Sequence, residues 1–178
     1  EDRDKGGNGY VPISLQYGPY KALLAREKSI AFGDPVIDPQ ITNRSYKAKE
    51  ITASNLSDLT SILTTKAAMS GKPVIVVVNA NKPMVVAEFE KEVDGIFYGF
   101  NIMDQAVLET ISGGNEPSAL LPIQMPLNMA VVEKQMEDVP HDMQVHVDSE
   151  GHAYDFAYGM NWKGVISDKR TAHYQKRQ

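Results

Sequence analysis

The densest group of potential metal ligands lies between residues 141 and 152. It contains three histidines and three acids: His141, Asp142, His146, Asp148, Glu150 and His152. Imidazole and carboxylate groups could together hold a divalent metal, and His146, Asp148 and His152 would share one face of an extended strand. The stretch also contains Ser-Glu-Gly, which is typical of a solvated hairpin tip. We favour the hairpin tip and expect no metal site.

A second candidate surface is aromatic. The single tryptophan, Trp162, follows Tyr154, Phe156 and Tyr158, which alternate along the chain. These rings could form a stacking platform for a sugar, but alternating aromatic residues more often pack one face of a sheet. Packing is the favoured interpretation, and sugar binding remains the alternative.

Motifs for several other chemistries are missing from the sequence. It has no G-x-S-x-G, no P-loop and no H-E-x-x-H. The glycines Gly6, Gly7 and Gly9 precede any predicted strand, so they indicate a flexible turn and not a dinucleotide fingerprint. The chain has no cysteine, which excludes disulfides and thiolate chemistry but leaves the cellular compartment open.

Charge and length exclude two further classes. The 18 basic and 23 acidic residues give a net charge of -5, so no broad basic field exists to bind nucleic acid. No apolar run approaches the roughly 18 to 20 residues that a membrane span needs. The charged start, Glu1 to Lys5, is unlike a signal peptide. Because the chain does not begin with Met, we expect it to be processed or truncated.

The elements that must position these residues lie within an α/β core predicted over residues 53–168. Helical spacing predicts helices at about 54–70, 84–93, 103–112 and 128–137. The β-branched run from Val74 to Val78 predicts a central parallel strand buried on both faces. Residues 95–100 predict a second strand, and 120–125 an edge strand next to Pro122 and Pro126. The alternating order implies right-handed crossovers.

The two flanking segments have less pattern. Residues 1–52 are rich in glycine and proline and are expected to form a loop-rich part of the same domain. Within them we predict an extended piece at 10–17 and a helix from Tyr20 to about Lys28, started by Pro19. Residues 169–178 are predicted to be a solvated basic tail.

Four segments, in matching order and spacing, resemble the C-terminal domain of family 3 glycoside hydrolases, the β-glucosidase-like enzymes. Residues 72–83 are similar to that family's strand and turn GKPVVVVLNAGRP, and 92–96 to its EVDAIL strand. Residues 116–122 resemble NPSGRLP, and 154–162 the closing FGYGLSY motif. The family's PGQEGG turn is replaced here by residues 100–105, and Ala119 and Leu120 replace Gly and Arg. These departures indicate a divergent subgroup with changed specificity, or one whose site is displaced.

The resemblance implies a flavodoxin-like layered sandwich, with a mostly parallel sheet flanked by helices. It also implies retaining hydrolysis of β-linked sugars by a nucleophile and an acid/base carboxyl about 5 to 5.5 Å apart. The family's nucleophilic Asp lies on a preceding (β/α)₈ barrel, which takes about 250 residues, so this chain should lack it. The acid/base Glu belongs to a loop of the second domain. That loop follows an early strand which this sequence does not show, and no family motif surrounds a Glu here, so we expect the acid/base residue to be missing or not identifiable. Glu27 is the leading candidate, ahead of Glu50, although each is more commonly an ordinary surface carboxylate.

We therefore predict the C-terminal domain of a family 3-type glycoside hydrolase, inactive by itself and without a cofactor. Its expected partners are the barrel of the same polypeptide and an oligosaccharide substrate, in the periplasm or outside the cell. One alternative is a free-standing carbohydrate-binding module that uses Trp162. Another is a flavodoxin-like nucleotide or regulatory domain, which would need a phosphate-cradling glycine turn that the sequence does not show.

Overall fold

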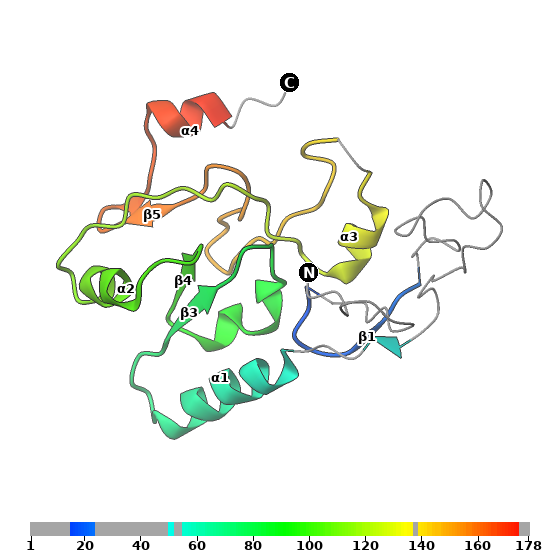
Figure 1. Cartoon of the computed structure of the whole chain (residues 1–178), viewed down its shortest axis with the longest axis horizontal. Coiled ribbons are helices and arrows are strands. Elements are labelled where there is room, and N and C mark those ends of the chain that lie inside the picture. The colour runs from blue at the N-terminus through cyan, green and yellow to red at the C-terminus, as the bar shows by residue number, and fades with distance from the viewer. Residues whose placement is uncertain (1–14, 24–49, 52–54, 137–138, 175–178) are drawn as a thin grey trace.

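The computed structural model describes residues 15–23, 50–51, 55–136 and 139–174 (Figure 1). In chain order its elements are β1 (Tyr20–Lys21), β2 (Glu50–Ile51), α1 (Leu56–Ala68), β3 (Ile75–Asn79), the 3₁₀ helices η1 (Val86–Glu88) and η2 (Glu90–Glu92), β4 (Gly95–Gly99), α2 (Asp104–Ile111), α3 (Met129–Lys134), β5 (Met160–Asn161), β6 (Gly164–Val165) and α4 (Lys169–Tyr174). Figure 1 shows α1 and α4 on opposite sides of the β3 and β4 pair.

The parallel pair β3 and β4 confirms the two main predicted strands. Five residue pairs are in register, from Ile75 with Gly95 to Asn79 with Gly99. The backbone pairing continues one residue further, where the Ala80 amide donates to the Gly99 carbonyl at 3.0 Å. Within the described residues, each of the three sheets has two strands. The α/β class is therefore seen here as helices around one parallel pair.

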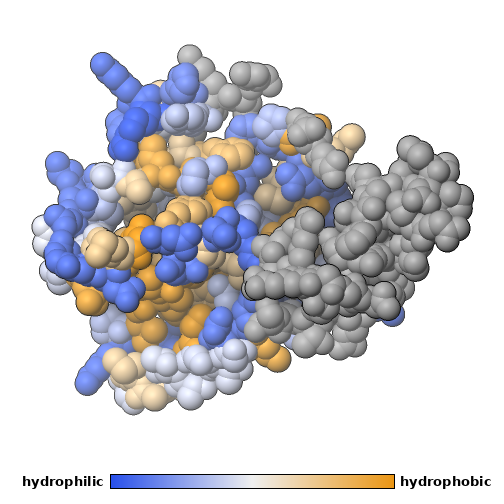
Figure 2. Space-filling view, viewed as in Figure 1, coloured by the Kyte–Doolittle hydropathy of each residue, from blue (hydrophilic) through white to orange (hydrophobic). Residues whose placement is uncertain are grey.

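The two faces of β3 are buried unequally, which corrects the expectation that the strand is covered on both. Val78 is only 8% exposed, whereas Ile75 and Val77 are 48% and 42% exposed. Side chains alternate along a strand, so Ile75 and Val77 share the face that is more exposed. In Figure 2, apolar residues accordingly gather in the middle of the visible face, where Figure 1 shows β3 and β4.

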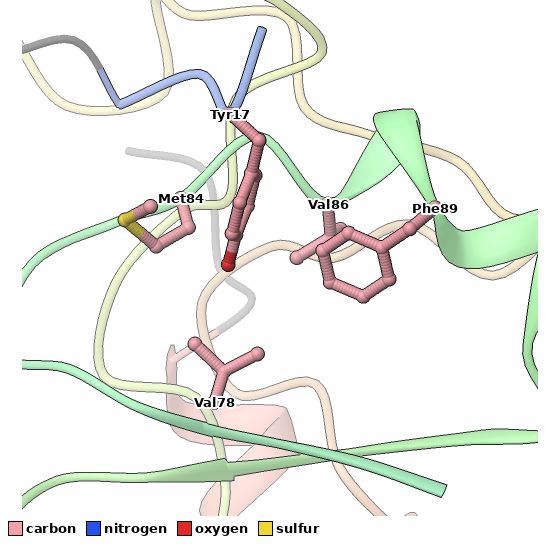
Figure 3. Packing of buried hydrophobic residues seen from close by; sticks show 5 residues of the cluster. All are labelled: Tyr17, Val78, Met84, Val86 and Phe89. Carbon is pink, nitrogen blue, oxygen red and sulfur yellow. The ribbon is translucent and has the colours of Figure 1, made fainter. Parts of the chain in front are cut away.

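The core lies on the opposite face of β3. Its buried members are Tyr17, Val78, Met84, Val86 and Phe89. Figure 3 shows Tyr17 reaching between Met84 on one side and Val86 and Phe89 on the other, toward Val78. The Tyr17 and Phe89 rings meet edge to face, with centroids 5.2 Å apart. Leu59 and Ile62 of α1 pack against this cluster from outside.

Three of the four predicted helices are confirmed, with shifted ends. The helix α1 stops before Ser70 and Gly71, which both have positive φ, and α2 fills the predicted span 103–112. The side chain of Asn128 caps α3 by accepting a hydrogen bond from the Val131 amide at 3.1 Å. In α2, Val107 is buried, whereas Leu108 is 67% exposed.

The helix predicted over residues 84–93 is instead two 3₁₀ turns, η1 and η2. They are separated by Phe89, whose φ of -139° is incompatible with a continuous α-helix. In a 3₁₀ helix, residues three apart lie on the same side, so Val86 and Phe89 point together into the core. Tertiary packing therefore decided the form of this segment.

Two other predicted elements are wrong where the structure describes them. Tyr20 and Lys21 form β1, which pairs antiparallel with β2, so a helix does not begin at Tyr20. The end of that predicted helix lies outside the described residues. So does most of the extended piece predicted at 10–17. Residues 120–125 form no strand. Pro122 and Pro126 lack amide protons, and the segment contributes a single bridge, between Pro126 and Val145.

The C-terminal region, residues 115–168, consists mostly of loop segments that contact one another, and it has little regular secondary structure. Its segments are joined by pairs of backbone hydrogen bonds, including Leu121 with Tyr158 and Ala157, and Met125 with Tyr154 and His146. The chain then turns through the short hairpin of β5 and β6 into α4. In α4, Thr171 is buried while its neighbours are exposed.

Candidate functional site

The six potential metal ligands at 141–152 do not come together. Asp142 accepts a hydrogen bond from the Met136 amide at 2.7 Å, which fixes a turn after α3. His141 instead lies beside Asp155, and His146 beside Glu90. Within the described residues, no group of three or more histidines and acids is placed to hold a metal ion.

Asp148, Glu150 and His152 form the predicted hairpin tip. Val147 and Ala153 bridge antiparallel, and Gly151 turns the chain with φ of 88°. Burial alone would raise the pKa of Asp148. Hydrogen bonds from the His152 amide at 2.8 Å, the His152 ring at 3.1 Å and the Glu150 amide at 3.0 Å outweigh that effect and lower its pKa.

His146 is the most buried histidine of the cluster, at 4% exposure. Its Nε2 atom lies 3.6 Å from Oε2 of Glu90, and Tyr154 covers the ring edge to face at 5.1 Å. The two imidazole nitrogens and this Glu90 oxygen are buried without a hydrogen-bond partner. This contact connects η2 to the C-terminal region across the sequence.

Two of the predicted aromatic residues, Tyr154 and Tyr158, stack on each other. The Tyr154 and Tyr158 rings lie nearly parallel with centroids 4.9 Å apart, and the His152 ring also stacks on Tyr158, at 5.9 Å. Burial, together with Asp148, Glu150 and Glu90, raises the pKa of Tyr158 to about 12, so its hydroxyl stays neutral. Trp162 is 57% exposed and lies between β5 and β6, so it does not extend the Tyr154 and Tyr158 stack.

A half-open pocket of about 340 Å³ lies beside this stack. Its lining combines two imidazoles, one carboxylate, two aromatic rings and two small apolar side chains: His141, His152, Ala153, Asp155, Phe156, Tyr158 and Val165. The volume is at the small end of the roughly 300 to 1,000 Å³ typical of ligand pockets. In the described part of the chain, this is where polar and aromatic groups converge.

Asp155 is the carboxylate of the pocket and is held in place by other groups. Its Oδ1 atom accepts hydrogen bonds from Nε2 of Gln124 at 2.8 Å and from the Phe156 amide at 2.7 Å. Nδ1 of His141 lies 3.6 Å from the same oxygen. His141 and Phe156 meet edge to face at 5.2 Å. The polar groups are thus fixed before any ligand arrives.

The side chains of the two predicted acid/base residues lie outside the part of the chain that the structure describes. Glu27 lies outside the described residues. The backbone of Glu50 is in β2, in register with Lys21 of β1. A third glutamate, Glu88, anchors the nearby segment, because its carboxylate accepts the amide protons of Tyr17 at 2.5 Å and Gly18 at 2.7 Å.

Sequence reasoning missed Glu88, Glu90, Gln124 and Asp155 as partners. Each acts on a residue that is distant along the chain, such as Glu88 on Tyr17 or Glu90 on His146. The one signal available was that acids follow the buried valines at 85 and 86, which did not specify what they contact.

Comparison with known proteins gives a family match. A family model, described as the glycosyl hydrolase family 3 C-terminal domain, matches residues 36–162. A protein named probable beta-glucosidase C from Aspergillus oryzae is 33% identical over 88 residues, which is 49% of this chain and 14% of that protein. Beta-glucosidase C of Emericella nidulans is 29% identical over 87 residues, 49% of this chain and 14% of that protein. No solved structure is significantly similar.

The matched part spans about one seventh of the length of these relatives. Within the described residues, no helix is long and apolar enough to cross a membrane. The candidate site thus belongs to a unit that corresponds to a small part of much longer proteins.

Proposed function

Since the chain belongs to the glycosyl hydrolase family 3 C-terminal domain family, we propose that it is the part of a β-glucosidase-like enzyme that completes the pocket of a separate barrel domain. The full-length protein would hydrolyse β-linked sugars with retention, and this chain alone would be inactive. The observation that carries the proposal is the family match over residues 36–162, which includes both strands of the parallel pair.

The exposed apolar face of β3 supports a larger layered sandwich. A parallel sheet is normally covered on both faces, yet Ile75 and Val77 are 48% and 42% exposed. In the full-length protein, further elements would cover this face and place β3 in the middle of the sheet. Polypeptide outside the described residues would supply them.

We propose Glu27 as the candidate for the acid/base role because it lies in residues 1–52, the part expected to face the barrel domain; no motif of the family surrounds it. The pairing of β1 with β2 brings residue 21 next to residue 50, so the segment that carries Glu27 begins and ends at one place. Glu88 and the buried Tyr17 fix that place against the core. Holding both ends of the segment in this way suits a carboxyl that must meet a nucleophile from another domain.

Hydrolysis of an aryl β-glucoside tests the proposal. The purified chain should release no aglycone, and the full-length enzyme with its barrel domain should release it with retention. Retention is measured by NMR of the first-formed anomer. Turnover by the chain alone, after contaminating glycosidases are excluded, would contradict the split between domains.

The role of Glu27 is tested separately in the full-length enzyme. The variant Glu27→Gln should lose activity most on glucosides with a poor leaving group, because those need proton donation, and less on activated aryl glucosides. Added azide should restore turnover and give a β-glucosyl azide. The matched control Glu50→Gln should show neither effect. An equal loss on both substrate types in Glu27→Gln would move the acid/base role elsewhere.

Export to the periplasm or out of the cell stays a prediction. Sugar binding through Trp162 also stays a prediction.

A further inference from the structure

We propose that the pocket beside the Tyr154 and Tyr158 stack binds a single pyranose ring. The pocket is lined by His141, His152, Asp155, Phe156 and Tyr158, with Ala153 and Val165 at its apolar edge. The inference rests on the proposed function only for the class of sugar to try, which is β-linked glucosides. The binding chemistry comes from the lining itself.

The polar groups suit hydroxyls. A sugar hydroxyl is both a donor and an acceptor, and it can meet a carboxylate that only accepts and an imidazole that does either. Asp155 and His141 are adjacent at 3.6 Å, close enough for two neighbouring hydroxyls to bind one each.

The apolar groups suit the C–H face of the ring. Phe156 and Tyr158 are half-buried and contribute aromatic carbon to the lining. The mixture of aromatic surface with a few fixed polar groups is the general composition of small-molecule sites. A volume of about 340 Å³ accommodates one hexose more readily than an extended chain.

Charge argues against an anionic ligand. Asp155 lines the pocket, and Asp148 and Glu150 lie 3.1 and 3.7 Å from Nδ1 of His152. Three carboxylates around two imidazoles repel a phosphate or a sulfate. A neutral polyol avoids this cost.

The pocket is also preorganised. His141 and Ala157 both have φ near +60°, a conformation that residues other than glycine rarely adopt. Ala157 is held there because its amide donates to the Leu121 carbonyl at 2.9 Å, while the Leu121 amide donates to Tyr158 at 2.7 Å. Phe156 and Tyr158, on either side of Ala157, are therefore fixed toward the pocket without a ligand.

The test is binding of methyl β-glucoside and cellobiose to the purified chain, by calorimetry and saturation-transfer NMR. We expect saturable binding with a millimolar Kd, as few contacts allow. Ala153→Leu should abolish it because the larger side chain fills part of the pocket that Ala153 lines, and Asp155→Asn should weaken it about tenfold. The matched control Ala172→Leu, on exposed α4, should leave the Kd within about twofold. Circular dichroism verifies that each variant folds.

Three results would overturn the inference. The first is no saturable binding up to about 100 mM sugar, well above a millimolar Kd. The second is binding that survives Ala153→Leu but is lost in Trp162→Ala, which would place the sugar at the β5 and β6 hairpin. The third is tighter binding of sulfate than of sugar. None of these depends on hydrolysis, so the inference can fail while the barrel-dependent activity stands, and the reverse also holds.

Discussion

The parallel unit, residues 74–111, and the C-terminal region, residues 115–168, are held together in different ways. In the parallel unit, strands in continuous register and buried valines provide the stability. In the C-terminal region, the described residues form few strands, and isolated backbone bonds, stacked rings and fixed carboxylates take their place.

This difference indicates which of the two regions can carry side chains for a binding site. The parallel unit uses its side chains for packing, and its exposed face is apolar. The C-terminal region carries histidines and acids near its surface, and the pocket is lined by some of them. The comparison predicts that the two regions respond differently to changes in volume, backbone space and pH.

The largest loss should come from Phe89→Ala in the parallel unit. Phe89 is 1% exposed and packs against Tyr17, so its removal leaves a cavity that the core cannot fill. We expect the free energy of unfolding to fall by about 3 to 5 kcal/mol in urea titrations. The control Phe100→Ala, at a ring that is 37% exposed, should cost less than half of that. Equal losses would show that this core does not dominate stability.

A backbone clash in the C-terminal region should come next. A Cβ at Gly159 would run into the carbonyl oxygen of Ala119, which is backbone and cannot rotate away. Gly159→Ala should therefore cost roughly 2 to 3 kcal/mol and shift NMR signals of residues near Leu121. In the parallel unit, Gly95→Ala meets only the Ile75 side chain at 3.7 Å and should cost little. A mild Gly159→Ala would mean that the C-terminal region adjusts more easily than its hydrogen bonds suggest.

Removal of the hydrogen bonds that the Tyr17 and Gly18 amides donate to Glu88 should reduce stability by an intermediate amount. Glu88→Ala leaves two amides without their charged acceptor, so we expect a loss of about 1.5 to 2 kcal/mol in the free energy of unfolding. The exposed Glu92 provides the matched control, and Glu92→Ala should change little. In the full-length enzyme, Glu88→Ala should also lower kcat if the anchor positions the Glu27 segment. Unchanged stability would remove Glu88 from the account of how that segment is held.

How far the sequence predicts the molecule follows the same division. The run at 74–78 and the period of α1 reveal the parallel unit, because burial imposes a repeat on the sequence. They did not reveal that Ile75 and Val77 are exposed, since a continuous apolar run does not say which face is covered. In the pocket, His141 and Phe156 were named from the sequence, but Asp155 and Gln124 were not. Nothing in local spacing shows that Gln124 meets a residue 31 positions later.

The smallest effect should be a change in acid sensitivity at the hairpin tip. Asp148 has a lowered pKa in the folded state, so its ionised form contributes stability above the ordinary value of 3.8. That stability is lost as the pH falls through the lower folded value. Asp148→Asn should cost about 1 kcal/mol at pH 7, and in urea titrations the difference from wild type should begin to shrink as the pH falls below 3.8 and disappear below the lowered folded pKa.

Asp94 gives the matched measurement in the parallel unit. Hydrogen bonds from Lys66 at 2.6 Å and from the Val74 amide at 2.8 Å lower its pKa, but its side chain is 45% exposed. Salt screens an exposed pair more strongly than a covered one. Asp94→Asn should therefore have an effect that shrinks in 1 M NaCl, while that of Asp148→Asn, whose carboxylate is 8% exposed, should persist. The opposite order would show that solvent reaches the Asp148 carboxylate as readily as that of Asp94.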